Sequence, residues 1–304
     1  MNNGLGDLAP PALALQSVTY NNEPDAVLRS ITALSVSAAN AQRKGMISSW
    51  SLHLGNCSAE RIFDDEQRSR ATDIVQSFGG DVRFTHFGEN LGHGGAHNRL
   101  AADDDSDLIA FVNPDGIVDP ATVTALVIAL TPAVGIVDAR QIPLEHPKEF
   151  DAESGVTSWA SGALSLMRRK AFELVGGFDS QTFFLYCDDV DLSWRVRLAG
   201  YTVVHAPAAR LFHDKRLSVR ADYDPSEAEL YYSAEATLLL AHKFDRPDVV
   251  ESVMKQYADD PQEHIVRAVK EFRRREATGE LPQVVENADT VTTFDKGFYA
   301  DHRY

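Results

Sequence analysis

Apolar runs and amphipathic stretches alternate along the first half of the chain. Short runs rich in branched and aromatic residues, typical of strands, occupy residues 13–20, 47–54, 82–87 and 108–112. Stretches with helical spacing lie between them, at residues 26–39, 64–78 and 96–102. This repeated alternation predicts an α/β fold with a mostly parallel sheet and flanking helices.

The pattern changes in the second half. Strands are predicted at residues 158–166 and 202–206, a turn at 206–210, and helices at 168–174 and 190–199. From residue 225 the spacing is helical throughout, over residues 227–244, 247–257 and 262–275, and a polar, mobile tail is expected from Gly279. We therefore predict an α/β domain over residues 1–220 and a helical C-terminal region with a polar tail over residues 221–304.

Composition narrows the class of protein. The 304 residues are 44% hydrophobic and 24% charged, as in ordinary soluble proteins. No run approaches the ~18 apolar residues of a membrane span, and the N-terminus lacks a signal-peptide pattern. Cys57 and Cys187 have no metal-binding or redox spacing. We expect a cytoplasmic protein with reduced cysteines and no transmembrane segment.

The net charge of −16 bears on partners. Such a chain is a poor general binder of nucleic acid or anionic lipid. If its ligand carries phosphates, binding needs local help, most simply from a divalent cation held by carboxylates.

One candidate carboxylate follows the apolar run at residues 108–112. Asn113-Pro114-Asp115-Gly116 reads as a turn at the C-terminal end of that strand. Ligands of open parallel sheets bind beyond the carboxyl ends of the strands, so Asp115 stands where a ligand-holding carboxylate belongs. An ordinary turn aspartate is the alternative.

Three further carboxylates, Asp188, Asp189 and Asp191, directly follow the apolar run at residues 183–186. Apolar neighbours penalise the ionised form, which makes such a carboxylate a candidate base or metal ligand. Capping of the following helix is the alternative, because Asp suits a helix N-terminus. Capping requires one or two of the three, and at least one remains to be explained.

Several common motifs are absent. The loop at residues 92–97 lacks the third glycine of a dinucleotide fingerprint, because His97 takes its place. His93 and His97 have zinc-helix spacing, but Gly94 stands where the catalytic Glu would be. There is no P-loop and no serine-hydrolase elbow. The glycines of this loop are interpreted as allowing close approach of the backbone to a ligand.

Together these segments resemble glycosyltransferase family 2, the inverting enzymes with a GT-A fold, and most closely its rhamnosyltransferase- and galactofuranosyltransferase-like members. The resemblance covers residues 13–220. It rests on Val18-Thr19-Tyr20-Asn21, the glycine loop from Asn90 to Asn98, Asn113-Pro114-Asp115, Trp159-Ala160-Ser161-Gly162-Ala163, Gly176-Gly177-Phe178-Asp179, Asp188-Asp189-Val190-Asp191 and His213. It implies a Rossmann-like GT-A domain followed by the helical region.

The resemblance implies a donor site for a nucleotide-diphosphate sugar, UDP- or dTDP-linked. Asp115 and His213 would hold Mg²⁺ or Mn²⁺ against the diphosphate. The residues expected to line the nucleotide-sugar pocket are Thr19, Tyr20, Asn21, Asn56, Asn90, Gly94, Asn98, Asn113 and Asp115.

On the acceptor side, the resemblance makes Asp189 the general base and Asp188 a contact to acceptor hydroxyls. Trp159 and Gly162 would border the acceptor, a glycan or lipid-linked sugar, and the transferred sugar. Single displacement at the anomeric carbon requires a base on the acceptor side and charge neutralisation at the leaving diphosphate.

One departure from the family pattern affects the donor. Gly55 occupies the position of an Asp that usually contacts the nucleobase or ribose. A non-catalytic sugar- or partner-binding protein with the same fold therefore remains an alternative, and a sugar-nucleotide pyrophosphorylase is a weaker one.

The C-terminal helices are expected to pack on the first domain or to support self-association. The basic, amphipathic stretch at residues 263–275 leaves peripheral attachment to the inner face of a membrane as an alternative.

Overall fold

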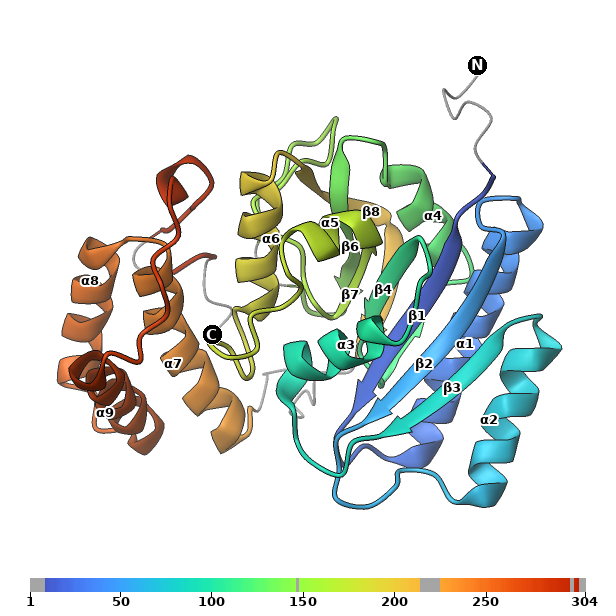
Figure 1. The fold of residues 1–304 in the computed structure, drawn as a ribbon, viewed down its shortest axis with the longest axis horizontal. Helices are drawn as coiled ribbons and strands as arrows, with labels where there is room; N and C mark the ends of the chain where they lie inside the picture. The colour runs from blue at the N-terminus through green and yellow to red at the C-terminus, as the bar shows by residue number, and fades with distance from the viewer. Residues whose placement is uncertain (1–8, 146–147, 214–224, 296–297, 301–304) are drawn as a thin grey trace.

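The computed structural model describes residues 9–145, 148–213, 225–295 and 298–300 (Figure 1). Its centre is one eight-stranded sheet with the order β3-β2-β1-β4-β7-β6-β8-β5. The strands are β1 (Ala12–Thr19), β2 (Ser49–Asn56), β3 (Asp81–His86), β4 (Leu108–Val112), β5 (Gly116–Val118), β6 (Val134–Ile142), β7 (Leu164–Arg168) and β8 (Thr202–His213).

Most neighbouring strands are parallel. β1 pairs in parallel with β2 and β4, β2 with β3, and β6 with β8. β7 runs antiparallel between β4 and β6, and β5 is an antiparallel edge strand on β8. The carboxyl ends of β1, β2 and β4 and the start of β7 therefore lie along one edge of the sheet. The predicted α/β fold with a mostly parallel sheet is confirmed.

Helices cover both faces of the sheet (Figure 1). One face carries α1 (Pro24–Arg43), α2 (Asp65–Ser77) and α4 (Thr122–Ala129), and the other carries α3 (Gly92–Ala102), α5 (Arg169–Leu174) and α6 (Asp188–Leu198). Alternate residues of β4 enter the two cores: Leu108, Ala110 and Val112 the first, Ile109 and Phe111 the second. Burial on both faces explains why this strand is apolar throughout.

The strand predicted at residues 158–166 is largely wrong. Residues 158–163 form a loop, and β7 begins at Leu164. The backbone N–H groups of Ser161 and Gly162 donate to the carboxylates of Asp138 and Asp189, so they are not available for a strand ladder. The elements β5, α4 and β6 were not predicted from the sequence.

The turn predicted at residues 206–210 is also wrong, because β8 continues to His213. Its pairing with β6 shifts register there: Ala139 pairs with Ala206, and Arg140 pairs with Arg210. Pro207 lies in the bulge that results, where the missing N–H costs no ladder bond. The proline marks an irregularity within a strand and does not end it.

The C-terminal region contains α7 (Glu227–Lys243), α8 (Pro247–Ala258) and α9 (Glu263–Thr278), followed by a 3₁₀ turn at Ala288–Thr290. In Figure 1 these helices stand beside α6, at the opposite end of the molecule from α2. Trp194 of α6 packs edge-on against Phe244 and Phe294, with ring centroids at 4.8 and 5.2 Å. Helix α6 thus has one face on the sheet and the other on the C-terminal helices.

The expected mobile tail is wrong for much of its length. Ala288 and Val291 are buried in the core shared with α6, and the carbonyl of Val291 accepts a hydrogen bond from Arg197. The boundary predicted near residue 220 falls outside the described residues. Among the described helices, none is long and apolar enough to cross a membrane.

Candidate active site

Asp189 lies where the start of α6 meets the loop before β7. Tyr186 and Cys187 adopt left-handed backbone conformations, with φ of 66° and 57°, and these turn the chain into the helix. The Asp189 carboxylate then accepts the backbone N–H of Gly162 at 2.8 Å. The predicted pair Asp189 and Gly162 is thus in direct contact, although 27 positions separate the two residues.

The Asp189 carboxyl has a pKa of about 6, raised by burial and by the neighbouring Asp188 carboxylate, with Gly162, His93 and Lys148 opposing the shift. A base is most effective when its pKa lies near the operating pH. Asp189 therefore has the ionisation behaviour of a general base working near neutrality.

Asp188 is buried and holds His93 of the glycine loop, with 2.7 Å between the carboxylate and imidazole Nδ1. Burial opposes the charge on His93, but Asp188 and Asp189 together raise its pKa above the ordinary value. His97 differs: burial, with a contribution from His93, holds its pKa well below the ordinary value. His97 is a neutral core residue on Phe111, with ring centroids 5.0 Å apart.

Asp191, the third carboxylate, points away from this site. It is fully buried and pairs with Arg195 at 2.6 Å and with Lys243 of α7 at 2.5 Å. Lys243 also contacts Asp179 at 2.7 Å. Asp191 therefore braces α6 against the C-terminal helices.

A second polar cluster lies at the end of β4. His213, at the end of β8, has its Nε2 atom 3.4 Å from Asp115 and 3.2 Å from the Asn113 amide. Its Nδ1 atom is buried without a hydrogen-bond partner among the described residues. The structure thus brings together Asp115 and His213, the predicted metal ligands, with Asn113, which was predicted for the nucleotide-sugar pocket.

In this cluster the protein offers two candidate ligands for a divalent cation, the Asp115 carboxylate and the His213 imidazole. No group of three or more Asp, Glu, His or Cys side chains that could hold a metal occurs among the described residues. The Asp115 carboxylate is 39% exposed, which leaves it accessible to a ligand. One carboxylate and one imidazole suit Mg²⁺ or Mn²⁺ if diphosphate and water oxygens complete the shell.

The two clusters are joined through the backbone. Asn113 N–H donates to the carbonyl of Ala163 at 2.9 Å, and Ala163 directly follows Gly162. The Asp115 site at the end of β4 therefore lies close to the loop before β7, against which Asp189 of α6 is held.

Three side chains predicted for the nucleotide pocket instead hold loops in place. Thr19 donates to the Asn56 side chain at 3.2 Å, and Asn56 donates to the Glu60 carbonyl at 2.7 Å. Asn98 pairs both ends of its amide with the backbone of Phe178, at 2.8 and 2.9 Å. A direct contact of these three side chains with a nucleotide stays a prediction.

The remaining nucleotide-side residues lie nearer the surface. Tyr20 is 53% exposed, and Asn21 has a φ of 54° with its N–H donated to Ser58. Asn90 is exposed and accepts the N–H of Gly92 at 3.2 Å. These loops are open to a ligand at the carboxyl ends of β1 and β3.

Two glycines of the loop at residues 92–97 pack closely against other parts of the protein. A Cβ on Gly92 would lie 2.3 Å from the Phe184 carbonyl, and one on Gly94 would lie 2.6 Å from Phe178. These contacts account for both glycines without a ligand. The close approaches seen here bring His93 against Asp188, and an approach of these glycines to a ligand stays a prediction.

An aromatic ring occupies the space beside Gly55. A Cβ at this position would lie 2.8 Å from Phe87 and 3.1 Å from Leu100. The space that the family's usual aspartate would use is therefore occupied by the Phe87 ring.

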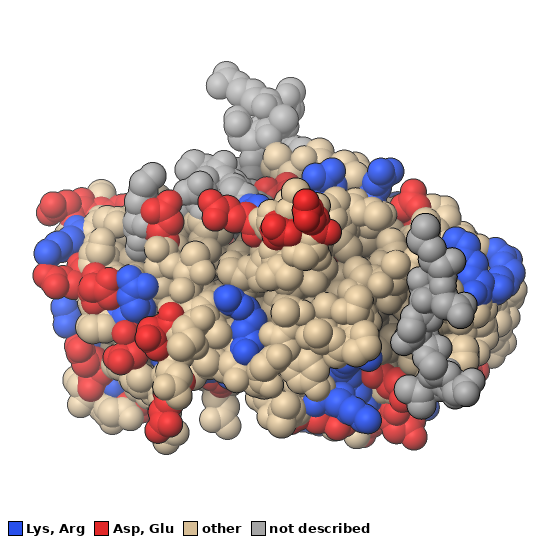
Figure 2. Space-filling view, turned by 90° about the horizontal axis from the view of Figure 1, so that it is seen from above, with Lys and Arg blue, Asp and Glu red and all other residues tan. Residues whose placement is uncertain are grey.

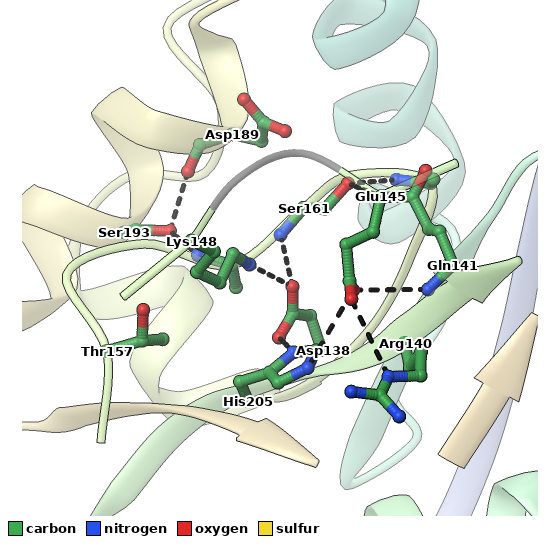
Figure 3. A network of polar contacts seen from close by, with 12 residues as sticks. Asp138, Arg140, Gln141, Glu145, Lys148, Thr157, Ser161, Asp189, Ser193 and His205 are labelled. Atoms are coloured by element: carbon green, nitrogen blue, oxygen red, sulfur yellow. Dashed lines mark hydrogen bonds and ion pairs between the residues drawn. The ribbon is translucent and has the colours of Figure 1, made fainter. Parts of the chain in front are cut away.

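A buried polar network around Asp138 was not found from the sequence (Figure 3). Asp138 of β6 is fully buried and holds Lys148, His205 at 2.9 Å and the Ser161 N–H at 2.9 Å. Although burial opposes ionisation, Lys148 and His205 lower the pKa of the Asp138 carboxyl. The sequence feature that could have indicated this network is Asp138 itself, a charged residue inside the apolar run Val134–Ala139.

The network also fixes Trp159. The Lys148 ammonium lies 4.1 Å from the centre of the Trp159 ring, and Tyr299 packs edge-on against the same ring. Trp159 is only 2% exposed, so it supports the loop that carries Gly162. Trp159 was predicted to border the acceptor. Because its ring is buried, we instead expect it to hold the Gly162 loop in place from beneath.

The face of the molecule seen in Figure 2 has no large basic patch over its described residues. Lys and Arg side chains are interspersed there with Asp and Glu over the described part of the surface.

Comparison with known proteins places this geometry in context. Residues 62–191 match the family model described as glycosyl transferase family 2. The chain is 29% identical to N-acetylglucosaminyl-diphospho-decaprenol L-rhamnosyltransferase of Mycobacterium tuberculosis, over 47% of this chain and 62% of that protein. It is 32% identical to rhamnosyltransferase WbbL of Escherichia coli, over 33% of this chain and 39% of that one. The chain thus spans less than two thirds of either relative.

Solved structures agree on the fold. A mannosyltransferase of Pyrobaculum calidifontis in complex with GDP-Man and Mn²⁺ superposes with a TM-score of 0.56 at 13% identity, covering 92% of this chain and 83% of that one. GalNAc-T7 with UDP, GalNAc and Mn²⁺ gives 0.60 at 10% identity, covering 91% and 60%. The GT-A fold with a helical C-terminal region is confirmed.

Proposed function

We propose, on the premise that residues 62–191 belong to glycosyl transferase family 2, that this chain moves a sugar from a nucleotide-diphosphate sugar to a hydroxyl group of a glycan or lipid-linked acceptor. The relatives are rhamnosyltransferases by name, which favours a deoxyhexose donor, UDP- or dTDP-linked. The reaction is a single displacement with inversion at the anomeric carbon.

The observation that carries the proposal is the pair of neighbouring carboxylate sites, one after the end of β4 and the other at the start of α6, beside the loop before β7. Asp189, with a pKa of about 6, accepts the proton of the acceptor hydroxyl. Asp188 contacts hydroxyl groups of the acceptor. The backbone N–H of Gly162 holds the Asp189 carboxylate in position. At the other site, Asp115 and His213 face the leaving group.

A divalent cation fits the second site. Mg²⁺ or Mn²⁺, held by Asp115 and His213, would supply Lewis-acid stabilisation of the leaving diphosphate. Asn113 keeps the His213 ring oriented through a 3.2 Å contact. With a net charge of −16, the protein has few other means of accommodating a diphosphate.

The alternative of a non-catalytic sugar-binding protein has one observation in its favour, namely the Phe87 ring in the space beside Gly55. An altered donor pocket is compatible with catalysis, whereas a binding protein gives no reason for an exposed Asp115 beside His213 and a base-like Asp189. The enzyme is the better account of the geometry.

Screening nucleotide sugars for thermal stabilisation, with and without Mn²⁺, tests the proposal. We expect one donor class, UDP- or dTDP-linked, to raise the melting temperature in the presence of Mn²⁺. Incubation of that donor with candidate acceptors should then release nucleoside diphosphate. Stabilisation by free sugars alone, with no turnover of any donor, would favour the binding protein.

A further inference from the structure

His93 is an ionisable side chain of the glycine loop for which the proposed reaction gives no role. Its Nδ1 lies 2.7 Å from the Asp188 carboxylate, and its side chain is 18% exposed. A Cβ on Gly162 would lie 3.0 Å from His93 Cε1 and 3.5 Å from the Asp189 Cβ. His93 and Asp189 therefore flank the same glycine, on the face where an acceptor would approach.

The glycine loop is built to place this imidazole. Gly92 allows the His93 N–H to reach the Phe184 carbonyl at 3.2 Å, and Gly94 leaves room for Phe178. The His93 ring also packs edge-on against Phe178, with centroids 5.4 Å apart. Its position is thus fixed from three sides: by its backbone, by an aromatic ring and by a carboxylate.

The ionisable groups around His93 and Asp189 come from three parts of the chain. Asp188 and Asp189 lie at the start of α6, and Cys187, whose burial raises its thiol pKa, directly precedes them. His97 of α3 is neutral, and Lys148 reaches Asp189 electrostatically from the segment after β6. Two adjacent carboxylates in a buried site oppose each other's ionisation. A cation against Asp188 relieves this repulsion.

We propose that His93 is a positioning residue of the transfer reaction, in which its imidazolium, held by Asp188, keeps Asp189 in the ionised form that accepts a proton. The inference rests on the proposed function. Both carboxylates raise the pKa of His93 even though burial opposes its charge, which agrees with an imidazolium in this place.

The proton balance is simple. The acceptor O–H bond breaks and its proton moves to Asp189, while the oxygen lone pair forms the new bond to the anomeric carbon. The bond from that carbon to the diphosphate oxygen breaks, and its electron pair leaves with the nucleoside diphosphate. His93 neither gains nor loses a proton.

The test uses two neutral replacements in the full-length chain. His93→Asn retains an amide N–H near Asp188 without a charge, and His93→Phe retains a ring. Without the cation the pKa of Asp189 rises, so a smaller fraction is ionised at low pH. We expect nucleoside diphosphate release from the donor chosen by screening to fall ~10-fold at pH 5.5 and to stay within about 2-fold of the unmodified protein at pH 8.5. His242→Asn, in α7, is the matched control and should leave the profile unchanged.

A second measurement does not depend on activity. The ¹³C chemical shift of the Asp189 carboxyl should titrate at higher pH in both His93 variants than in the unmodified protein. An unmoved titration, together with an unmoved acidic limb, overturns the inference. So does a loss as large as that of Asp189→Asn at every pH, because His93 would then be the proton acceptor itself. Full activity of Asp189→Asn would instead overturn the proposed function, so the two failures can be told apart.

Discussion

The carboxylate of Asp189 and the backbone N–H of Gly162 are joined by a 2.8 Å hydrogen bond that connects α6 to the loop before β7. The bond orients the carboxylate from outside its own helix. It also means that the position of the base depends on the loop that Asp138 anchors through Ser161. Catalytic geometry and the buried network of Figure 3 are therefore linked.

Replacing Asp189 by Asn removes the proton acceptor while retaining the shape of the side chain and an oxygen for the Gly162 N–H. We expect turnover to fall by about two or more orders of magnitude and donor affinity to change little. Steady-state kinetics combined with calorimetric donor titration checks this. Near-normal turnover on a true acceptor would remove Asp189 from its role.

Removing the ligands of the second site should act on the donor. Asp115→Asn and His213→Ala should each weaken donor binding in Mn²⁺, because the cation loses one of its two protein ligands. Calorimetry with and without excess EDTA is the measurement, and the chelator should abolish the difference between these variants and the unmodified protein. Asp119→Asn, at a nearby exposed acid, is the control. Equal donor affinity with and without EDTA in the unmodified protein would exclude the metal.

Asp191→Asn should affect stability more than chemistry. The change leaves Lys243 and Arg195 without their buried carboxylate, which costs about 3 kcal/mol of unfolding free energy. Urea unfolding measures this, and turnover per folded molecule should remain well above that of Asp189→Asn. A variant with unchanged stability and abolished turnover would place Asp191 in the reaction.

Asp138 should make stability depend on pH. Its pKa is lowered in the folded protein, so its contribution is fully present above the unfolded value of about 4 and is lost as pH falls through the folded value. Asp138→Asn should therefore cost about 3–5 kcal/mol at pH 7, because it leaves Lys148 buried without its partner. The difference from the unmodified protein should shrink below about pH 4. A difference independent of pH in denaturant unfolding would contradict this account.

Helix α9 should bind membranes weakly despite its basic residues. Arg273, Arg274 and Arg275 pair with glutamates, and Arg267 lies 4.6 Å from the centre of the Tyr231 ring. These contacts leave little of the basic charge available to anionic lipid. Sedimentation with anionic liposomes should show little bound protein. Strong, salt-sensitive binding that is lost on deleting residues 262–304 would show that α9 is a membrane anchor.

The parts of the fold that follow from local pattern were predictable. Strand β4 is apolar throughout because both faces are buried, and helix α6 carries an apolar stripe. The loop at residues 158–163 was not predictable, because its backbone hydrogen bonds go to the carboxylates of Asp138 and Asp189, both distant in sequence. Likewise, the tail beyond Gly279 looks polar, yet Val291 and Phe294 pack on α6 through tertiary contacts alone.

Part of the candidate site could likewise be predicted from the sequence, and part could not. The sequence already placed Asp115 at the end of a strand and Asp189 at the start of a helix, and the structure brings the two sites together through the hydrogen bond between Asn113 and Ala163. The sequence could not show that Asn98 holds Phe178, because a side-chain amide looks the same whether it faces a ligand or a neighbouring backbone. Nor could it show that His93 and Asp188 meet, since 95 positions separate them.

The contact between Gly55 and Phe87 limits which substitutions position 55 can accept. An acidic residue at position 55 meets the Phe87 ring at 2.8 Å from its first side-chain atom. Substitution at 55 alone is therefore disfavoured until position 87 has become smaller, and a smaller residue at 87 first opens a gap beside Leu100. The two positions are therefore coupled, and an acidic residue at position 55 is accommodated only when the change at position 87 comes first.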